Sequence, residues 1–135
     1  MKSHLKRIFS ILKKSPVINR GAQGEILAEK FLRRKGLKII ETNFRIRGGE
    51  IDIIAEEGDI TVFVEVKTRS THLFGTPGES INYYKKKFLR KTALFYLKKR
   101  GKPFKARFDV IFVNLTSDNR LKSIELVRNA FPFEE

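Results

Sequence analysis

The chain has 135 residues, a net charge of +14 and 41% hydrophobic residues, which is typical of one domain with a packed core. It contains no cysteine, so disulfide bridges, thiolate zinc sites and cysteine nucleophiles are excluded. No apolar run approaches the roughly 20 residues that span a bilayer, and the N-terminus lacks the apolar stretch of a secretory signal. We therefore expect a cytoplasmic protein with no membrane span.

The positive charge is concentrated in two segments. Residues 1–20 contain six Lys or Arg and residues 85–105 contain ten, with no acid in either segment. The rest of the chain has 13 basic and 15 acidic residues and is close to neutral. Such segregation favours a polyanionic partner, of which nucleic acid is the commonest. An anionic membrane surface and a merely solvated lysine-rich helix are the alternatives.

The first 18 residues are expected to form a basic arm, which Ser15 and Pro16 separate from the rest. This arm is either a frayed tail or an anchor on a nucleic-acid backbone or a membrane surface. Residues 19–135 are expected to form a single domain that begins with a helix over 21–35. The apolar stripe of this helix has Glu25 at its edge and consists of Leu27, Ala28, Phe31 and Leu32.

A meander of three strands and a second helix follow. The strands are predicted over residues 37–46, 50–57 and 60–69. After a loop over 70–78, a helix is predicted over 79–100, and two further strands over 106–115 and 121–131. This order predicts an α/β fold in which helices flank a central mixed β-sheet of four to five strands.

The helix predicted over 79–100 has apolar residues on more than one side. One side carries Ile81, Tyr84, Phe88 and Phe95. The opposite side carries Lys86, Lys87 and Arg90, although Leu94 and Leu97 also lie there. Glu79 is expected to cap the positive N-terminal end of this helix.

Charged residues interrupt two otherwise apolar strands in "GGEIDIIAEEGDITVFVEVKTR", residues 48–69. Alternation places Glu65 and Lys67 on one face of their strand. In the preceding strand, Asp52 shares a face with Glu50, opposite Ile51 and Ile53. If the two strands pair, these acids and the lysine converge on one side of the sheet.

Burial of an unpaired carboxylate costs several kcal/mol, so these acids need compensation. A pair between Glu65 and Lys67 would leave surplus negative charge, which Mg²⁺ or Mn²⁺ would remove because both prefer oxygen ligands. Lys67 could then orient or deprotonate a water and stabilise charge on a phosphate. This arrangement suits phosphodiester hydrolysis, and an ordinary salt-bridge network in the sheet is the alternative.

The strings "GEIDIIA" and "VFVEVKTR", followed by "FGTPGESI" and a basic helix, give the chain a specific resemblance. It is similar to the YraN-like (UPF0102) family of bacterial predicted endonucleases. That family resembles the archaeal Holliday junction resolvases of the PD-(D/E)xK nuclease superfamily. The resemblance implies a restriction-endonuclease-like core and a metal-dependent, structure-selective DNA endonuclease. Branched or junction DNA is the candidate substrate that it suggests, and a homodimer is the candidate assembly.

The resemblance also implies a role for each residue of the motif. The catalytic set is Glu25, Asp52, Glu65 and Lys67. The ligands of Mg²⁺ or Mn²⁺ would be Asp52, Glu65 and the carbonyl of Val66, with Lys67 as the catalytic lysine. Ile51 stands where the superfamily's name has Pro, which we interpret as a minor departure.

Seven cations are expected to contact the nucleic-acid backbone, where point charges fix register and carry little base information. They are Arg45, Arg47, Lys85, Lys86, Lys87, Arg90 and Lys91. For the two arginines, a solvated strand edge is an equal alternative. Asp109 is expected to form a structural ion pair, with Arg107 or with a neighbouring strand. The rival of the endonuclease hypothesis is a non-catalytic nucleic-acid-binding protein that retains the nuclease fold.

Overall fold

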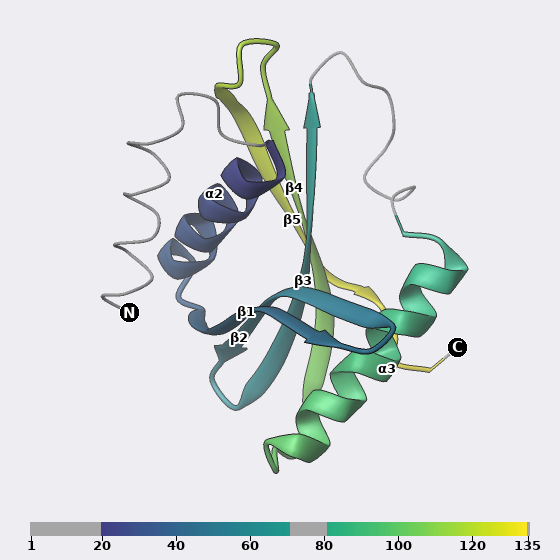
Figure 1. The fold of residues 1–135 in the computed structure, drawn as a ribbon. Helices are drawn as coiled ribbons and strands as arrows, with labels where there is room; N and C mark the ends of the chain where they lie inside the picture. The colour runs from purple at the N-terminus through teal and green to yellow at the C-terminus, as the bar shows by residue number, and fades with distance from the viewer. Residues whose placement is uncertain (1–19, 71–80, 135) are drawn as a thin grey trace.

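The computed structural model describes residues 20–70 and 81–134 (Figure 1). The predicted basic arm, Glu79 and all but the first residue of the predicted loop lie outside the described residues. No helix among the described residues is long and apolar enough to cross a membrane. The elements in chain order are α2 (Arg20–Arg34), β1 (Lys38–Ile46), β2 (Gly49–Glu57), β3 (Ile60–Ser70), α3 (Tyr83–Lys99), β4 (Ala106–Leu115) and β5 (Leu121–Phe131).

The strands form one sheet in the order β1-β2-β3-β4-β5. All neighbouring strands are antiparallel except β3 and β4, which are parallel. A parallel pair needs a long connection, and α3 lies within it. The predicted α/β fold with a mixed sheet flanked by helices is therefore confirmed.

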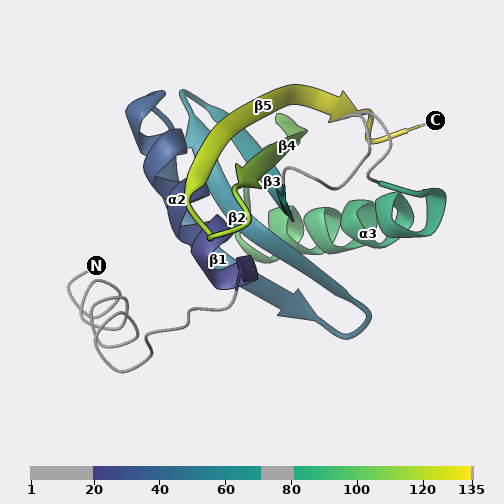
Figure 2. The same ribbon diagram turned by 90° about the horizontal axis from the view of Figure 1, so that it is seen from above.

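The two helices cover opposite faces of the sheet (Figure 2). On the α2 side, Ala28 and Leu32 pack against Val62 and Val64 of β3. On the α3 side, Phe63 of the same strand packs with Leu89 and Ala93. The predicted stripe of the first helix and the predicted alternation of β3 are both confirmed.

The predicted alternation of β2 is wrong at Asp52. Ile51 packs in the core on the α3 side, whereas Ile53 packs in the core on the α2 side. The β1–β2 ladder pairs the residues on either side of this point but does not pair Asn43 with Asp52. Asn43 has a φ of 54°, a left-handed conformation that interrupts the extended backbone of β1 opposite Asp52.

The second helix begins later than predicted. Asn82 caps it by accepting a hydrogen bond from the Lys85 amide at 2.9 Å, and its first residue is Tyr83. Asn is among the preferred N-cap residues because its side chain satisfies an amide that lacks a partner in the helix.

The predicted apolar side of α3 does not pack on the sheet. Tyr84, Phe88 and Phe95 are 70%, 45% and 45% exposed. The packed face instead carries Leu89, Thr92, Ala93, Tyr96 and Leu97. Thr92 can be buried because its hydroxyl donates to the Phe88 carbonyl at 2.7 Å, and Gly49 of β2 approaches it closely. A methyl group on Gly49 would lie 1.9 Å from Thr92 Oγ1.

Candidate active site

The acids of the two apolar strands lie where β2 and β3 separate. The ladder between these strands ends at the pair Ile53 and Val64, although β2 begins at Gly49 and β3 continues to Ser70. Beyond this end, the Val66 amide donates to Asp52 Oδ2 at 2.8 Å. A buried backbone amide needs a partner, and here a side chain takes the place of the missing ladder bond. We call this region, with the acids around it, the fork.

Two acids are in direct contact within the fork. The carboxyl group of Glu65 lies close enough to that of Asp52 to disfavour the charged form of Asp52. Burial raises the pKa of Asp52 to about 7, and the hydrogen bond and charge of Glu65 add to this rise. Glu65 itself is only 5% exposed. The pair therefore places two carboxyl groups side by side in a largely buried position.

A third acid of the fork is Glu25, which belongs to α2, on the face of the sheet opposite α3. Burial raises the pKa of Glu25 to about 7, with further contributions from the charges of Asp52 and Glu50. With its amide nitrogen turned toward the acids, Asn43 donates to Glu25 at 3.2 Å and to Glu50 at 3.3 Å. The break in β1 thus supplies a donor for two of the acids. Helix α2 and strands β2 and β3 together bring Glu25, Glu50, Asp52 and Glu65 to the fork.

A glycine positions the helix that carries Glu25. Gly24 is buried against β3, and a methyl group at this position would lie 1.8 Å from Thr68 Oγ1. A larger residue would therefore push α2 away from the strand. The motif in which Gly24 precedes Glu25 permits the close approach that places this acid beside Asp52.

Two lysines flank Glu65. Lys85 Nζ of α3 lies 3.1 Å from Glu65 Oε2, and Lys67 Nζ of β3 lies 3.9 Å from the same oxygen. The predicted pair between Glu65 and Lys67 is therefore present, but Lys85 is the closer partner. Lys85 was predicted to be one of the cations that contact a nucleic-acid backbone. No local sequence pattern indicates its contact with Glu65, which depends on where α3 crosses the sheet.

The donor set at the fork is of the kind that binds Mg²⁺ or Mn²⁺. No three His, Cys, Asp or Glu side chains within residues 20–70 and 81–134 are grouped closely enough to hold a metal ion. Mg²⁺, however, is usually held by one or two carboxylates, with waters and substrate phosphates as its other ligands. Asp52 and Glu65 fit this pattern because they are two carboxyl groups that lie close to each other. The carbonyl of Val66 stays a predicted ligand.

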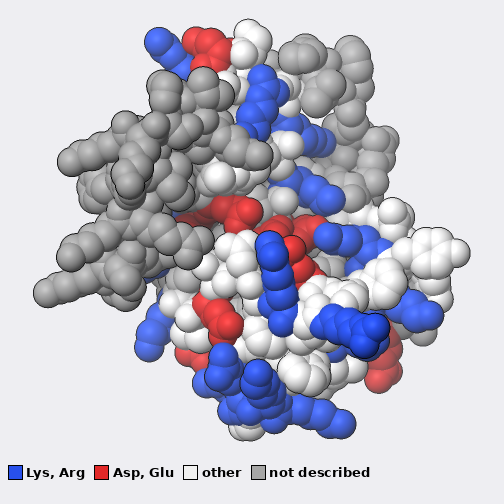
Figure 3. Space-filling view, viewed as in Figure 1, with Lys and Arg blue, Asp and Glu red and all other residues white. Residues whose placement is uncertain are grey.

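The remaining predicted cations lie at several places around the fork. Arg45 Nε lies 3.1 Å from Glu50, and Arg47 is exposed near the end of the β1–β2 hairpin. Lys86 and Arg90 lie over the Phe131 ring, at 5.7 and 5.5 Å from its centroid. Lys87 and Lys91 are exposed on α3. Figure 3 shows acidic side chains in the middle of one face of the molecule, with Lys and Arg side chains around them.

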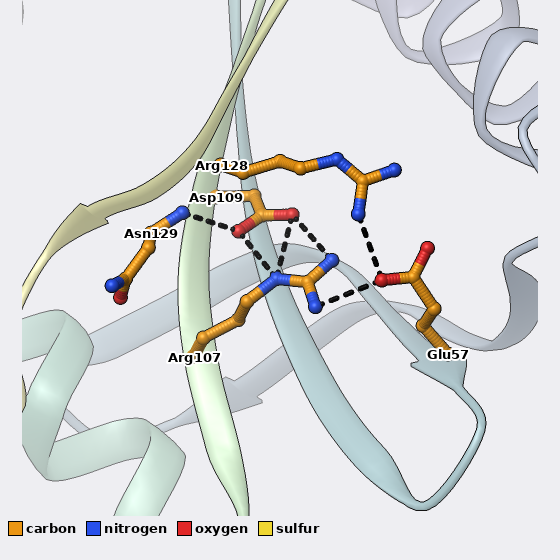
Figure 4. A network of polar contacts seen from close by, with 5 residues as sticks. All are labelled: Glu57, Arg107, Asp109, Arg128 and Asn129. Atoms are coloured by element: carbon orange, nitrogen blue, oxygen red, sulfur yellow. Dashed lines mark hydrogen bonds and ion pairs between the residues drawn. The ribbon is translucent and has the colours of Figure 1, made fainter.

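Asp109 belongs to a separate network (Figure 4). Its carboxylate accepts hydrogen bonds from Arg107 Nε at 3.0 Å and from the Asn129 amide at 2.9 Å. Arg107 also pairs with Glu57 at 2.9 Å, and Arg128 pairs with Glu57 at 2.8 Å. The predicted ion pair between Asp109 and Arg107 is confirmed, and the network includes none of the four acids of the fork.

Comparison with known proteins places the chain among close relatives. Residues 24–113 match the family model described as Uncharacterised protein family UPF0102. A UPF0102 protein of Thermodesulfovibrio yellowstonii is 46% identical over 114 residues, covering 84% of this chain and 96% of that protein. A UPF0102 protein of Clostridium tetani is 46% identical over 112 residues, covering 82% and 92%. The matched range contains all four predicted catalytic residues.

Proposed function

The chain belongs to the UPF0102 family, and from this premise we propose that it is a metal-dependent, structure-selective endonuclease that hydrolyses phosphodiester bonds of DNA. The observation that carries the proposal is the contact between Asp52 and Glu65, with Lys67 and Lys85 beside them. Two buried carboxyl groups in contact oppose folding unless a proton or a cation neutralises them. Such a pair supports the proposal that a cation binds here.

Asp52 and Glu65 would hold Mg²⁺ or Mn²⁺, with the Val66 carbonyl as a further ligand. When bound, such an ion polarises a scissile phosphate and lowers the pKa of the water that attacks it. The break in the β2–β3 ladder leaves the Asp52 carboxylate between the strands, where a backbone bond would otherwise exclude a ligand.

The lysines provide positive charge without competing as ligands. The side chain of Lys67 is 32% exposed and that of Lys85 is 43% exposed. Each lysine can therefore contact Glu65 and also reach a phosphate in solvent. Lys67 orients the attacking water or stabilises the charge that develops on the phosphate. Lys85 offers a second ammonium from the other side of Glu65. It would exchange its contact with Glu65 for one with the substrate.

Glu25 supplies a group that exchanges protons near neutral pH. A carboxyl group with a pKa of about 7 is present in both protonation states at that pH. It can therefore accept a proton from a nearby water and release it again. Asn43 holds Glu25 by its hydrogen bond to Oε1.

The test is cleavage of labelled linear duplex, single-stranded, flap and four-way-junction DNA in Mg²⁺ and in Mn²⁺. Glu65→Ala and Lys67→Ala should each reduce cleavage by about 100-fold or more. Glu41→Ala and Lys102→Ala are matched controls because each removes one partner of an ion pair away from the fork. Cleavage that persists in both fork variants would overturn the proposal.

One observation favours a second candidate, a nucleic-acid-binding protein without turnover. The acids of the described residues do not gather into a three-ligand cluster, and Glu65 already has an ion-pair partner in Lys85, at 3.1 Å. Under this alternative, the wild-type protein and Asp52→Ala bind the same DNA panel equally well, and neither cuts any member of it in Mg²⁺ or Mn²⁺.

A further inference from the structure

The solvent side of α3 carries a line of aromatic rings. Tyr84, Phe88 and Phe95 follow one another at helical spacing, and exposed Lys91 fills the position between the last two. At 100° per residue, these four side chains lie on one side of the helix. From Tyr84 to Phe95 the line extends about 16 Å along the axis. We call these four residues the aromatic face.

Within residues 20–70 and 81–134, no packing contact explains all of the rings of the aromatic face. The sheet is covered by the other side of the helix, which contains Leu89, Ala93 and Tyr96. Phe95 contacts Phe44 at 6.4 Å between ring centroids, but Tyr84 contacts only the exposed ring of Tyr83 among the ring pairs found in the described residues, at 5.5 Å. Single exposed rings are ordinary in soluble proteins, whereas a line of them marks a contact surface.

Charge narrows the choice of partner for this surface. Helix α3 contains seven Lys or Arg and no acid. A second copy of the chain, docked symmetrically on this face, would place these cations against their own equivalents. A polyanion would neutralise them instead. Single-stranded nucleic acid supplies phosphates for the lysines and flat bases for the rings, and base stacking on aromatic side chains is largely independent of sequence.

The position of the aromatic face relative to the fork favours nucleic acid over an anionic membrane. Tyr84 is followed directly by Lys85, whose ammonium lies 3.1 Å from Glu65. One turn further along α3, the Phe88 carbonyl is approached by Gly49 of the β1–β2 hairpin. A methyl group on Gly49 would lie 3.3 Å from the Phe88 carbonyl oxygen. Figures 1 and 2 show the hairpin beside α3. The helix that carries the aromatic face thus lies next to both the acids and the hairpin that carries exposed Arg45 and Arg47.

We propose that the aromatic face binds unpaired nucleotides of the substrate by base stacking, while Lys87 and Lys91 contact their phosphates. The preferred substrate is then DNA with a single strand next to a duplex, such as a flap or a splayed fork. The cutting of such DNA rests on the proposed endonuclease function, whereas the binding does not. Binding can therefore be measured without cleavage.

The test uses the full chain in EDTA, with oligonucleotides that carry the fluorescent base 2-aminopurine in the single-stranded part. Wild type, Tyr84→Ala/Phe88→Ala and the conservative Tyr84→Phe/Phe88→Tyr are compared on single strand, flap and blunt duplex. Phe104→Ala is the matched control because Phe104 is 63% exposed and lies after the end of α3. Thermal unfolding of each variant checks that the fold is retained.

The alanine pair should weaken binding to single strand and flap by about tenfold or more per ring, and should abolish the quenching of 2-aminopurine that stacking causes. Binding to blunt duplex should change by less than about twofold, because backbone contacts dominate there. The conservative pair and Phe104→Ala should bind as wild type does.

Equal loss on duplex and single strand, or no loss at all, would overturn the stacking proposal. The proposal would also be overturned if the alanine pair binds oligonucleotides as wild type does but binds vesicles containing phosphatidylserine more weakly than wild type. In Mg²⁺, an alanine pair that cuts flaps as wild type does would remove the stacking proposal and leave the nuclease intact. If the wild type shows quenching of 2-aminopurine but never cuts DNA, the stacking proposal stands and the endonuclease proposal fails.

Discussion

The fork and the Asp109 network both bury carboxylates in the same sheet, and they compensate them in different ways. In the network, Asp109 and Glu57 are matched by Arg107 and Arg128. Hydrogen bonds from Arg128, and then from Arg107, hold the pKa of Glu57 below its usual range.

In the fork, the pKa of Asp52 and that of Glu25 are both raised to about 7, because burial and neighbouring acids disfavour their charged forms. The nearest cations are two partly exposed lysines, and two of the acids touch each other. Balanced ion pairs suit a structural role, whereas neighbouring carboxyl groups with raised pKa values are typical of the functional site that we propose for the fork.

The largest expected difference between the two regions is in activity. Glu65→Gln removes a charge from the fork and should reduce DNA cleavage by about 100-fold or more, which is at least about 2.7 kcal/mol in the barrier. Its thermal stability should stay the same or rise, because the contact between two acids is relieved. Glu57→Gln is the control and should cut DNA at the wild-type rate. A comparable loss of cleavage in both variants would erase the distinction between the regions.

The next effect is on stability. Asp109→Ala leaves Arg107 without its buried partner and should lower the free energy of unfolding by about 3 kcal/mol or more. Asp118→Ala, which removes an acid from the exposed pair with Arg120, should cost less than about 1 kcal/mol. Urea denaturation of both variants measures the difference. If Asp109→Ala is as stable as Asp118→Ala, the network does not have the structural role assigned to it.

A smaller effect tests how the fork is assembled. Gly24→Ala should displace α2 from β3 and lower the free energy of unfolding by roughly 1–3 kcal/mol, as overpacking of a core does. Cleavage should fall as well, because Glu25 moves with the helix. Adding Thr68→Ala removes the clashing hydroxyl and should restore part of both properties. Failure of this rescue would show that the contact of Gly24 with Thr68 does not set the position of Glu25.

The smallest effect is the response to a cation alone. Mg²⁺ or Mn²⁺ at about ten times its Kd should stabilise the folded protein by about 1.4 kcal/mol, since it binds the native state only. Thermal unfolding at constant ionic strength measures this, and Asp52→Asn should abolish the rise. An equal rise in Asp52→Asn would place cation binding outside the fork.

Much of the fold follows from local patterns in the sequence. The apolar runs predict all five strands, and the stripe around Ala28 and Leu32 predicts how α2 packs. The face of α3 could not be predicted in the same way, because both sides of this helix carry large apolar residues. Its packing depends on the close approach of Gly49 to Thr92, two residues far apart in the chain.

The acids of the site could be named from sequence, but their arrangement could not. Alternation assigns Asp52 to a face of β2 only where a regular ladder continues, and here the ladder ends one residue away. The β1–β2 ladder is interrupted at the same point, where Asn43 of β1 has a left-handed backbone conformation opposite Asp52. The contact of Lys85 with Glu65 likewise depends on where α3 crosses the sheet, which no local pattern specifies.

The hydrogen bond between the Val66 amide and Asp52 has a consequence for dynamics. β3 is the middle strand of the sheet, where backbone amides exchange with solvent only when the protein opens widely. The Val66 amide is held by a side chain, so its exchange rate follows how long the Asp52 carboxylate stays in place. The exchange rate of this one amide therefore measures how often the Asp52 carboxylate leaves its position in the fork, and residue-resolved hydrogen exchange can detect it.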